Sequence, residues 1–177
     1  ARYAESTGKT VNFAYPHAWR YRDWVIDAFA ADMPWDAFIR AQLAGDLLPA
    51  DTPARAAAGT IATGFLALGA KALNERDGLK YELDVADEQI DVTTQAFLGL
   101  TVACARCHDH KVDPFSQADY AALAGIFRST ETCYGTVPFI NAQRPSALVA
   151  LPADAGLPAG TAPLAPEELA RVEARIR

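Results

Sequence analysis

The sequence predicts a mainly α-helical domain, followed by a long irregular segment that contains many proline and glycine residues. Two observations indicate this class. Apolar residues recur at helical spacing in several segments, and outside 134–140 little of the chain has the composition of a β-strand. A third observation is that Pro and Gly recur through 129–164 without a regular period. With 177 residues, of which 51% are hydrophobic, the chain is long enough to bury a core.

Two amphipathic helices are expected near the N-terminus, after an irregular entry over residues 1–16. In 17–31, apolar residues follow helical spacing and alternate with charged ones. Pro34 fits the first turn of a second helix, which is expected to end near Gly45.

The middle of the chain is expected to hold a connection, a packed helix and then the longest helix. Residues 46–58 contain two prolines and are typical of a connection, with a short helical start expected after Thr52. The small apolar residues of 59–70 predict a tightly packed helix. After a polar loop over 74–78, a long helix is expected over 85–100, with acidic residues near the positive end of its dipole. Its apolar stripe consists of Ile90, Thr94, Phe97 and Leu98.

A last helix is expected over 117–127, because Ser116 is a good N-cap that follows a turn. We therefore divide the chain into a helical domain over 1–130, a loop or linker over 131–164 and the start of a further helix over 165–177. Both ends look as if they continue, so we expect a piece of a longer protein with further domains.

The charge of the chain excludes some partners. The 16 basic and 22 acidic residues give a net charge of −6, which argues against nucleic acid as the main partner. No apolar run approaches the roughly 20 residues that a membrane helix needs, so no membrane span is expected. Three cysteines are too few for a disulfide-stapled scaffold.

Two of the cysteines form the motif that predicts a function, Cys104-Ala105-Arg106-Cys107-His108. The pattern C-x-x-C-H is the attachment signature of c-type haem. A tight turn brings the two thiols to the separation of the two haem vinyl groups, and the next residue, His108, is placed to bind the iron. We therefore expect one covalently attached haem c, and a helical c-type cytochrome-like domain over 1–130.

The cysteines and histidines of this motif could also bind zinc or form a redox-active thiol pair. Cys104, Cys107, His108 and His110 are also zinc-ligand types, although four ligands within seven residues are crowded for a closed tetrahedral site. A thioredoxin-type thiol pair would follow a strand, whereas the segment before this motif is expected to be helical. Cys133 stands alone and is expected to be a partly buried thiol.

Six further side chains are candidates for contacts with the haem or its ligands. His17 is a candidate distal iron ligand, and Met33 is a weaker one that more simply packs in its loop. Arg20 and Lys111 could pair with haem propionates, and His110 could bond either a propionate or the local backbone. Asp109 could hydrogen-bond an imidazole N–H and so tune the iron.

Several motifs together resemble the planctomycete-type cytochrome c domain family, a haem-binding module of large secreted proteins. The resemblance covers roughly residues 1–130, and it implies a c-type haem at Cys104, Cys107 and His108 and a periplasmic or extracellular location. At position 17 this sequence has His where the family usually has Asn. The motifs that carry the resemblance are Ala18-Trp19-Arg20-Tyr21-Arg22-Asp23, Gln42-Leu43-Ala44-Gly45-Asp46, Asp87-Glu88-Gln89-Ile90-Asp91, Phe97-Leu98-Gly99-Leu100-Thr101 running into Cys104 to Lys111, and Asp119-Tyr120 to Phe127.

Three functions are compatible with the motif. In the first, the haem carries electrons outside the cytoplasm to a redox partner protein or a neighbouring haem domain. In the second, a peroxidase-like enzyme uses an open iron position, with Arg20 or Arg22 polarising a small oxidant. In the third, the cysteines and histidines belong to a structural metal-binding module. We favour electron transfer, because the sequence shows one haem motif and no further catalytic constellation.

Overall fold

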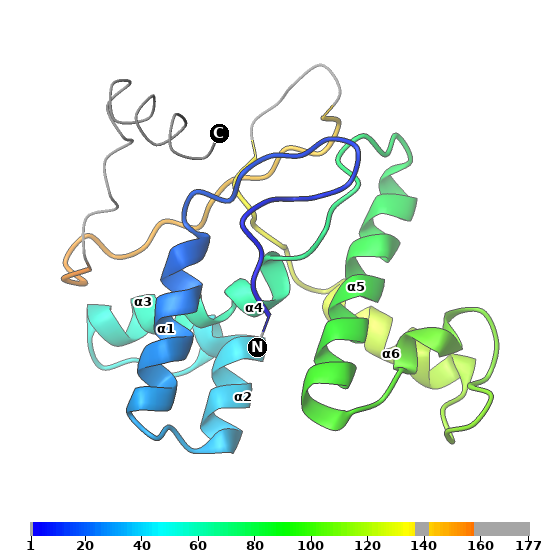
Figure 1. The fold of residues 1–177 in the computed structure, drawn as a ribbon, viewed down its shortest axis with the longest axis horizontal. Coiled ribbons are helices and arrows are strands. Elements are labelled where there is room, and N and C mark those ends of the chain that lie inside the picture. Colours follow the sequence, from blue (N-terminus) through cyan, green and yellow to red (C-terminus); the bar gives the residue numbers. More distant parts are fainter. Residues whose placement is uncertain (1, 137–141, 158–177) are drawn as a thin grey trace, which may run out of the picture.

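The structure is a computed structural model, and it describes residues 2–136 and 142–157. The described part is built from helices (Figure 1), which confirms the predicted mainly α class. It contains no strand, only two isolated antiparallel bridges, Ser6 with Ala14 and Thr136 with Ser146. The elements in order are α1 (Ala18–Ala30), α2 (Trp35–Ala44), η1 (Gly45–Leu47), α3 (Pro53–Ala62), α4 (Gly64–Ala67), α5 (Gly78–Leu98), η2 (Val102–Arg106) and α6 (Gln117–Phe127).

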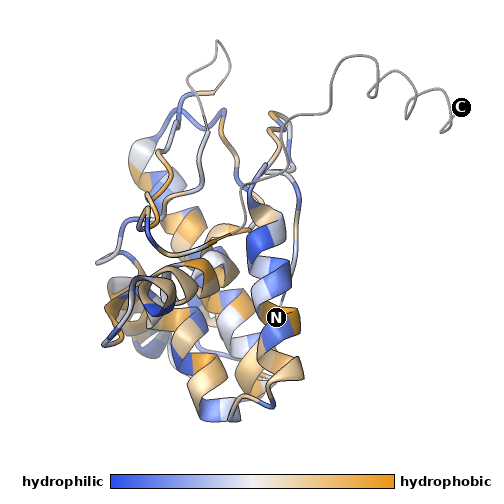
Figure 2. Cartoon of the chain, turned by 90° about the vertical axis from the view of Figure 1, so that its left-hand side faces the viewer, coloured by the Kyte–Doolittle hydropathy of each residue, from blue (hydrophilic) through white to orange (hydrophobic). Residues whose placement is uncertain are grey.

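The helices form two groups, and α5 lies between them and contributes residues to the hydrophobic clusters of both. Helices α1 to α4 pack on one another on one side, whereas η2 and α6 pack against α5 and each other on the other side (Figure 1). One hydrophobic cluster lies on the α1 to α4 side and includes Phe65 and Tyr81, which are 0% and 8% exposed. A second, smaller cluster gathers around Ile90 and lies under η2 and α6. Figure 2 shows the alternation of hydrophilic and hydrophobic positions along the helices that this two-sided packing requires.

The first two helices and the last one confirm the predictions made for them. Helix α1 occupies 18–30 of the predicted 17–31, and α2 begins directly after Pro34. Helix α6 covers the predicted 117–127, and Ser116 caps it with a reciprocal capping box to Asp119.

The long helix α5 begins seven residues earlier than predicted. Its N-cap is Asp77, whose side chain accepts a hydrogen bond from the Lys80 N–H at 3.1 Å. The acidic residues around Asp87 therefore lie in the middle of the helix and not at its positive end, so the dipole argument is wrong. The helix ends at Leu98, two residues before the predicted end, because Gly99 takes a left-handed conformation with φ 67° and closes the last turn. Leu98 is 64% exposed and is not part of the buried stripe.

Helix α3 begins at Pro53, directly after Thr52, where the sequence predicts a helical start within the connection. Thr52 caps it by accepting a hydrogen bond from the Arg55 N–H at 3.2 Å. The backbones of Gly45 and Gly59 approach each other so closely that a side chain on either residue would collide with the backbone of the other. The close approach explains the small residues that the sequence carries here.

The segment after α6 is irregular, as predicted, but its described part packs onto the helical domain. The Tyr81 hydroxyl donates to the Tyr134 hydroxyl at 2.7 Å, and the Gln143 N–H donates to the Leu73 carbonyl at 2.7 Å. Part of the strand expected over 134–140 and the helix expected over 165–177 lie outside the described residues. Within the described residues, no helix is both long and apolar enough to cross a membrane.

Candidate functional site

The cysteine motif begins within the 3₁₀ helix η2 and continues directly past its end at Arg106, on the surface beside α5 and α6. In a 3₁₀ helix, residues three apart lie on the same side. Val102 and Ala105 form the inner side and are 1% and 0% exposed. Cys104 lies within η2 and Cys107 is the residue directly after its end, and both are exposed free thiols. Both thiols are therefore open to solvent.

His108 is exposed and has its ring oriented by the main chain. Its Nδ1 lies 2.7 Å from the Asp109 carbonyl oxygen. Because that oxygen can only accept, Nδ1 carries the hydrogen, and Nε2 is the nitrogen with the lone pair. A metal-binding histidine typically has this arrangement.

The sequence suggested a hydrogen bond from an imidazole N–H to the Asp109 carboxylate, and the structure shows a different partner. The carboxylate accepts a hydrogen bond from the Gln117 N–H at 2.8 Å, at the positive end of the α6 dipole. The Gln117 side chain donates in turn to the Arg106 carbonyl at 3.1 Å. Two hydrogen bonds thus join the motif to the start of α6.

His110 fastens the loop that follows the motif. Its Nδ1 accepts hydrogen bonds from the N–H groups of Asp113 at 2.8 Å and Val112 at 3.2 Å, and its Nε2 lies 3.1 Å from the Thr101 hydroxyl. The side chain is 8% exposed, and its ring meets Phe115 edge-on. Both ring nitrogens are therefore engaged within the chain, in keeping with the expected local-backbone role, and a haem contact of His110 stays a prediction.

Arg106, between the two cysteines, joins the turn to α5. Its guanidinium lies 2.8 Å from an oxygen of Asp84 and 3.0 Å from one of Asp87. The hydrogen bond to Asp84 raises the pKa of Arg106. Tyr120 of α6 donates to the same Asp87 at 2.6 Å. The sequence analysis did not predict these ion pairs of Arg106. The signal for them was the spacing of Asp84 and Asp87, which places two acids on one face of a helix.

A cleft of about 620 Å³ opens beside Cys104, between η2, α5 and the segment around Lys71. Four carboxylates of α5 line it, and Lys9 and Lys71 line it as well. Ion pairs tie several of these carboxylates to arginines: Arg106 holds two, and Arg2 holds Glu88. The lining thus combines charged side chains with apolar ones, and Cys104 lies at one edge.

Residues 1–132 match the model of the PSCyt2 family, described as a protein of unknown function (DUF1549). The chain belongs to the PSCyt2 family. The match spans all the helices described above and ends shortly after α6. Searches of curated proteins and of solved structures found no match.

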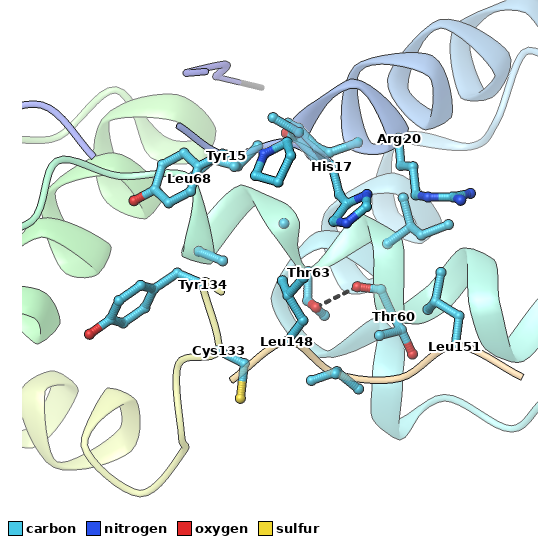
Figure 3. A pocket seen from close by; sticks show the side chains of 17 residues that line it. Tyr15, His17, Arg20, Thr60, Thr63, Leu68, Cys133, Tyr134, Leu148 and Leu151 are labelled. Carbon is cyan, nitrogen blue, oxygen red and sulfur yellow. Dashed lines mark hydrogen bonds between the residues drawn. The ribbon is translucent and has the colours of Figure 1, made fainter. Parts of the chain in front are cut away.

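In this PSCyt2 domain, His17 and Arg20 lie away from the motif. Both line a separate pocket at the start of α1 (Figure 3), and Figure 1 shows α1 and α6 at opposite sides of the molecule. Met33 lies in the turn between α1 and α2. The structure therefore does not bring these three residues to the cysteines, and their roles as distal ligand or propionate partner stay predictions.

The remaining predicted residues of the PSCyt2 domain have simple surroundings. Lys111 is exposed in the loop after the motif, three residues beyond His108. Cys133 is half-buried, and burial raises the pKa of its thiol. Among the residues that the structure describes, no group of three or more His, Cys, Asp and Glu side chains is arranged to hold a metal ion.

Proposed function

We propose that this PSCyt2 domain attaches one haem c through Cys104 and Cys107, with His108 as the proximal iron ligand, and that the haem carries electrons. The observation that supports the proposal is the exposure of both thiols, one within η2 and one directly after it, next to a histidine whose imidazole Nδ1 lies on a carbonyl oxygen, so that Nε2 is the nitrogen with the lone pair.

The chain's own residues supply a rigid support for such a group. Arg106, Asp109 and His110 each use their side chains to fix the turn to α5, to α6 or to Thr101. A bound haem would supply iron that changes between the ferric and ferrous states. Because the cysteines and His108 are exposed, a haem edge would lie at the surface, where a redox partner protein or a neighbouring haem domain can approach it.

The rest of the proposal follows from the chemistry of c-type haem and from the sequence. Thioether attachment at a C-x-x-C-H motif belongs with a periplasmic or extracellular location, and the expected further domains of the same chain are candidate neighbours for electron exchange. A negative net charge of −6 favours a partner with a basic docking face.

A second function, a peroxidase-like enzyme with an open iron position, is favoured by one observation. Among the described residues, His110 has both nitrogens engaged, and His17 and Met33 lie on other elements. The side of a haem opposite His108 would then take a small ligand. A high-spin spectrum of the native protein, together with peroxide turnover, would support this function, and a low-spin spectrum would favour electron transfer.

The test is production of the chain together with a c-type haem maturation system, followed by acid–acetone extraction and a pyridine haemochrome spectrum. We expect haem to stay with the protein. Cys104→Ser and Cys107→Ser should each reduce the retained haem strongly, and the double variant should retain none. Cys133→Ser, the matched control, should retain as much as the unchanged chain. If the unchanged, folded chain retains no haem, the proposal is wrong, and a structural role of the motif takes its place.

A further inference from the structure

Arg106 lies between the two cysteines of the motif and is the last residue of η2. Cys104 lies inside this helix, and its N–H donates to the Thr101 carbonyl at 3.0 Å. Cys107 lies directly past the end of the helix, so its place depends on where Arg106 is held. A 3₁₀ helix of five residues has poor hydrogen-bond geometry of its own, and contacts with neighbouring elements therefore fix its end.

The side chain of Arg106 attaches the end of η2 to α5. Its guanidinium lies 2.8 Å from an oxygen of Asp84 and 3.0 Å from one of Asp87. The side chains of Arg106, Asp84 and Asp87 are 34%, 35% and 27% exposed. A guanidinium that reaches two partly buried carboxylates has a fixed orientation, unlike an exposed ion pair with a single partner.

Helix α6, which packs against both α5 and η2 (Figure 1), holds Arg106 from a second direction. The Tyr120 hydroxyl donates to Asp87 at 2.6 Å, and Tyr120 is 7% exposed. The Gln117 side chain donates to the main-chain carbonyl of Arg106 at 3.1 Å. Contacts with two helices thus fix the residue that precedes Cys107.

Attachment through both cysteines depends on where the second thiol lies. In each bond-forming step, a thiol S–H adds across a vinyl C=C: the sulfur bonds to one carbon, the hydrogen goes to the other, and nothing is oxidised or released. Once one thiol has added, the second step is intramolecular, and its rate depends on the orientation of the remaining thiol. The position of Cys107 therefore decides whether one bond or two are formed.

We infer that Arg106 is a positioning residue for the second thioether bond, and that its contacts with Asp84 and Asp87 hold Cys107 where its thiol can add. This role rests on the proposed function and goes beyond it, because it makes the bond to Cys107 depend on an ion pair with α5. Arg106 acts through Cys107, so its loss should leave the bond to Cys104.

The test is production of the chain and its variants with a c-type haem maturation system, followed by two readouts. The α band of the pyridine haemochrome lies at longer wavelength when one vinyl group is unreacted. Alkylation of the unfolded protein before digestion shows which thiols are free, with Cys133 labelled in every variant as the internal standard. Arg106→Gln should give the longer-wavelength band, a free Cys107 and a bonded Cys104, whereas the unchanged chain should have both bonded.

Three further variants separate positioning from a loss of folding. Arg106→Lys keeps a cation for the two acids, and it should form the second bond more often than Arg106→Gln. Asp84→Asn leaves Arg106 with one acid, so it is the milder variant and should show a smaller loss of the same bond. Arg128→Gln is the matched control, because it removes an ion pair of α6 with Glu82 of α5 and leaves η2 untouched. Both bonds should form in it.

The outcomes distinguish this role from the proposed function. If Arg106→Gln, folded by circular dichroism, has both cysteines bonded, the inference is wrong. If Arg106→Gln does not fold, complete bonding in Asp84→Asn overturns the inference instead. An equal loss in Arg128→Gln would also overturn it, because the cause would then be a general loosening of α5 and α6. An unchanged chain without haem would contradict the proposed function itself, and the role of Arg106 with it.

Discussion

The side chains that pack on the two sides of α5 differ in kind. On the α1 to α4 side, rings pack against rings: Trp24 stacks on Phe38 with centres 5.4 Å apart, and Phe65 meets Phe97 at 5.1 Å. On the α6 side, the buried cluster consists largely of smaller side chains, such as Val102 and Ala105, and polar contacts join its elements. The first side has the larger core, and the second carries the cysteine motif.

The comparison shows how a surface turn can be held in place without a large core. Arg106, Asp109 and His110 attach η2 and its loop through hydrogen bonds and ion pairs, while the thiols stay outside. Burying rings stabilises a fold by several kcal/mol per side chain, whereas partly exposed polar contacts contribute about 1 kcal/mol each. We therefore expect substitutions on the two sides to differ in their effect on the free energy of unfolding.

The largest effect is expected from Phe65→Ala, in the aromatic core. Phe65 is 0% exposed and contacts Phe97, so its loss should reduce the free energy of unfolding by about 3–5 kcal/mol. Urea denaturation followed by circular dichroism measures this. Leu98→Ala, which removes a 64% exposed side chain at the end of α5, should change the value by less than about 0.5 kcal/mol. Equal effects of the two variants would contradict the comparison.

Lys71 gives the aromatic side a pH dependence. The residue is 2% exposed, and its ammonium donates to the carbonyl oxygens of Ala67 and Gly69 and lies 5.0 Å from the centre of the Tyr134 ring. Burial, and to a smaller degree Arg2, lowers the pKa of Lys71 from its ordinary 10.5 to about 7. Between these two values the unfolded chain binds a proton that the folded chain does not.

Stability should therefore rise with pH above 7, by up to about 1.4 kcal/mol per pH unit. The useful window is pH 7 to 9. Burial raises the pKa of Cys133 above its ordinary 9.0 and that of Tyr15 above 10.0, and these groups lower stability at higher pH. Urea denaturation at pH 7, 8 and 9 should show the rise in the unchanged chain and a flatter profile in Lys71→Met. The same slope in both would exclude Lys71 as the cause.

On the motif side, the largest effect is expected from His110→Ala. The variant leaves the N–H groups of Val112 and Asp113 and the Thr101 hydroxyl without this partner, which should cost about 1–3 kcal/mol. Protection of the Asp113 amide against hydrogen exchange should fall in the same variant. Unchanged exchange at Asp113 would show that His110 does not fasten the loop.

The smallest effect is expected from Ser116→Ala, which removes the capping box of α6. The Ser116 hydroxyl accepts from the Asp119 N–H at 3.2 Å, and its loss should cost about 1 kcal/mol. Thr52→Ala at the start of α3 is the matched control on the other side, with a comparable cap at 3.2 Å. An N-cap acts only on its own helix. We therefore expect the two variants to lose a similar amount of the free energy of unfolding, whereas substitutions in the two hydrophobic clusters should differ.

Sequence patterns predicted the helix boundaries best where a capping residue or a proline marks them. Pro34 and Ser116 marked the starts of α2 and α6. The start of α5 was missed because its N-cap, Asp77, lies in a polar stretch that is typical of a loop, and the first buried residue of the helix is Tyr81. Tyr81 is buried by Tyr134, more than fifty residues away, and local periodicity holds no information about such a contact.

The candidate site was predicted in part. The C-x-x-C-H spacing pointed to Cys104, Cys107 and His108, and the structure shows both thiols exposed, one within η2 and one directly after it. The grouping of His17 and Arg20 with the motif depended on chemistry alone. Their place at the start of α1 is set by how α1 packs on α3 and α4, which their residue types do not reveal.

The most direct test of haem attachment is intact-mass measurement of the chain produced with a c-type maturation system. We expect the main species to be heavier than the chain by the mass of one haem, and we expect digestion to place that mass on the peptide containing Cys104 and Cys107. A folded chain at its bare mass, or haem mass on the Cys133 peptide, would contradict the proposed function.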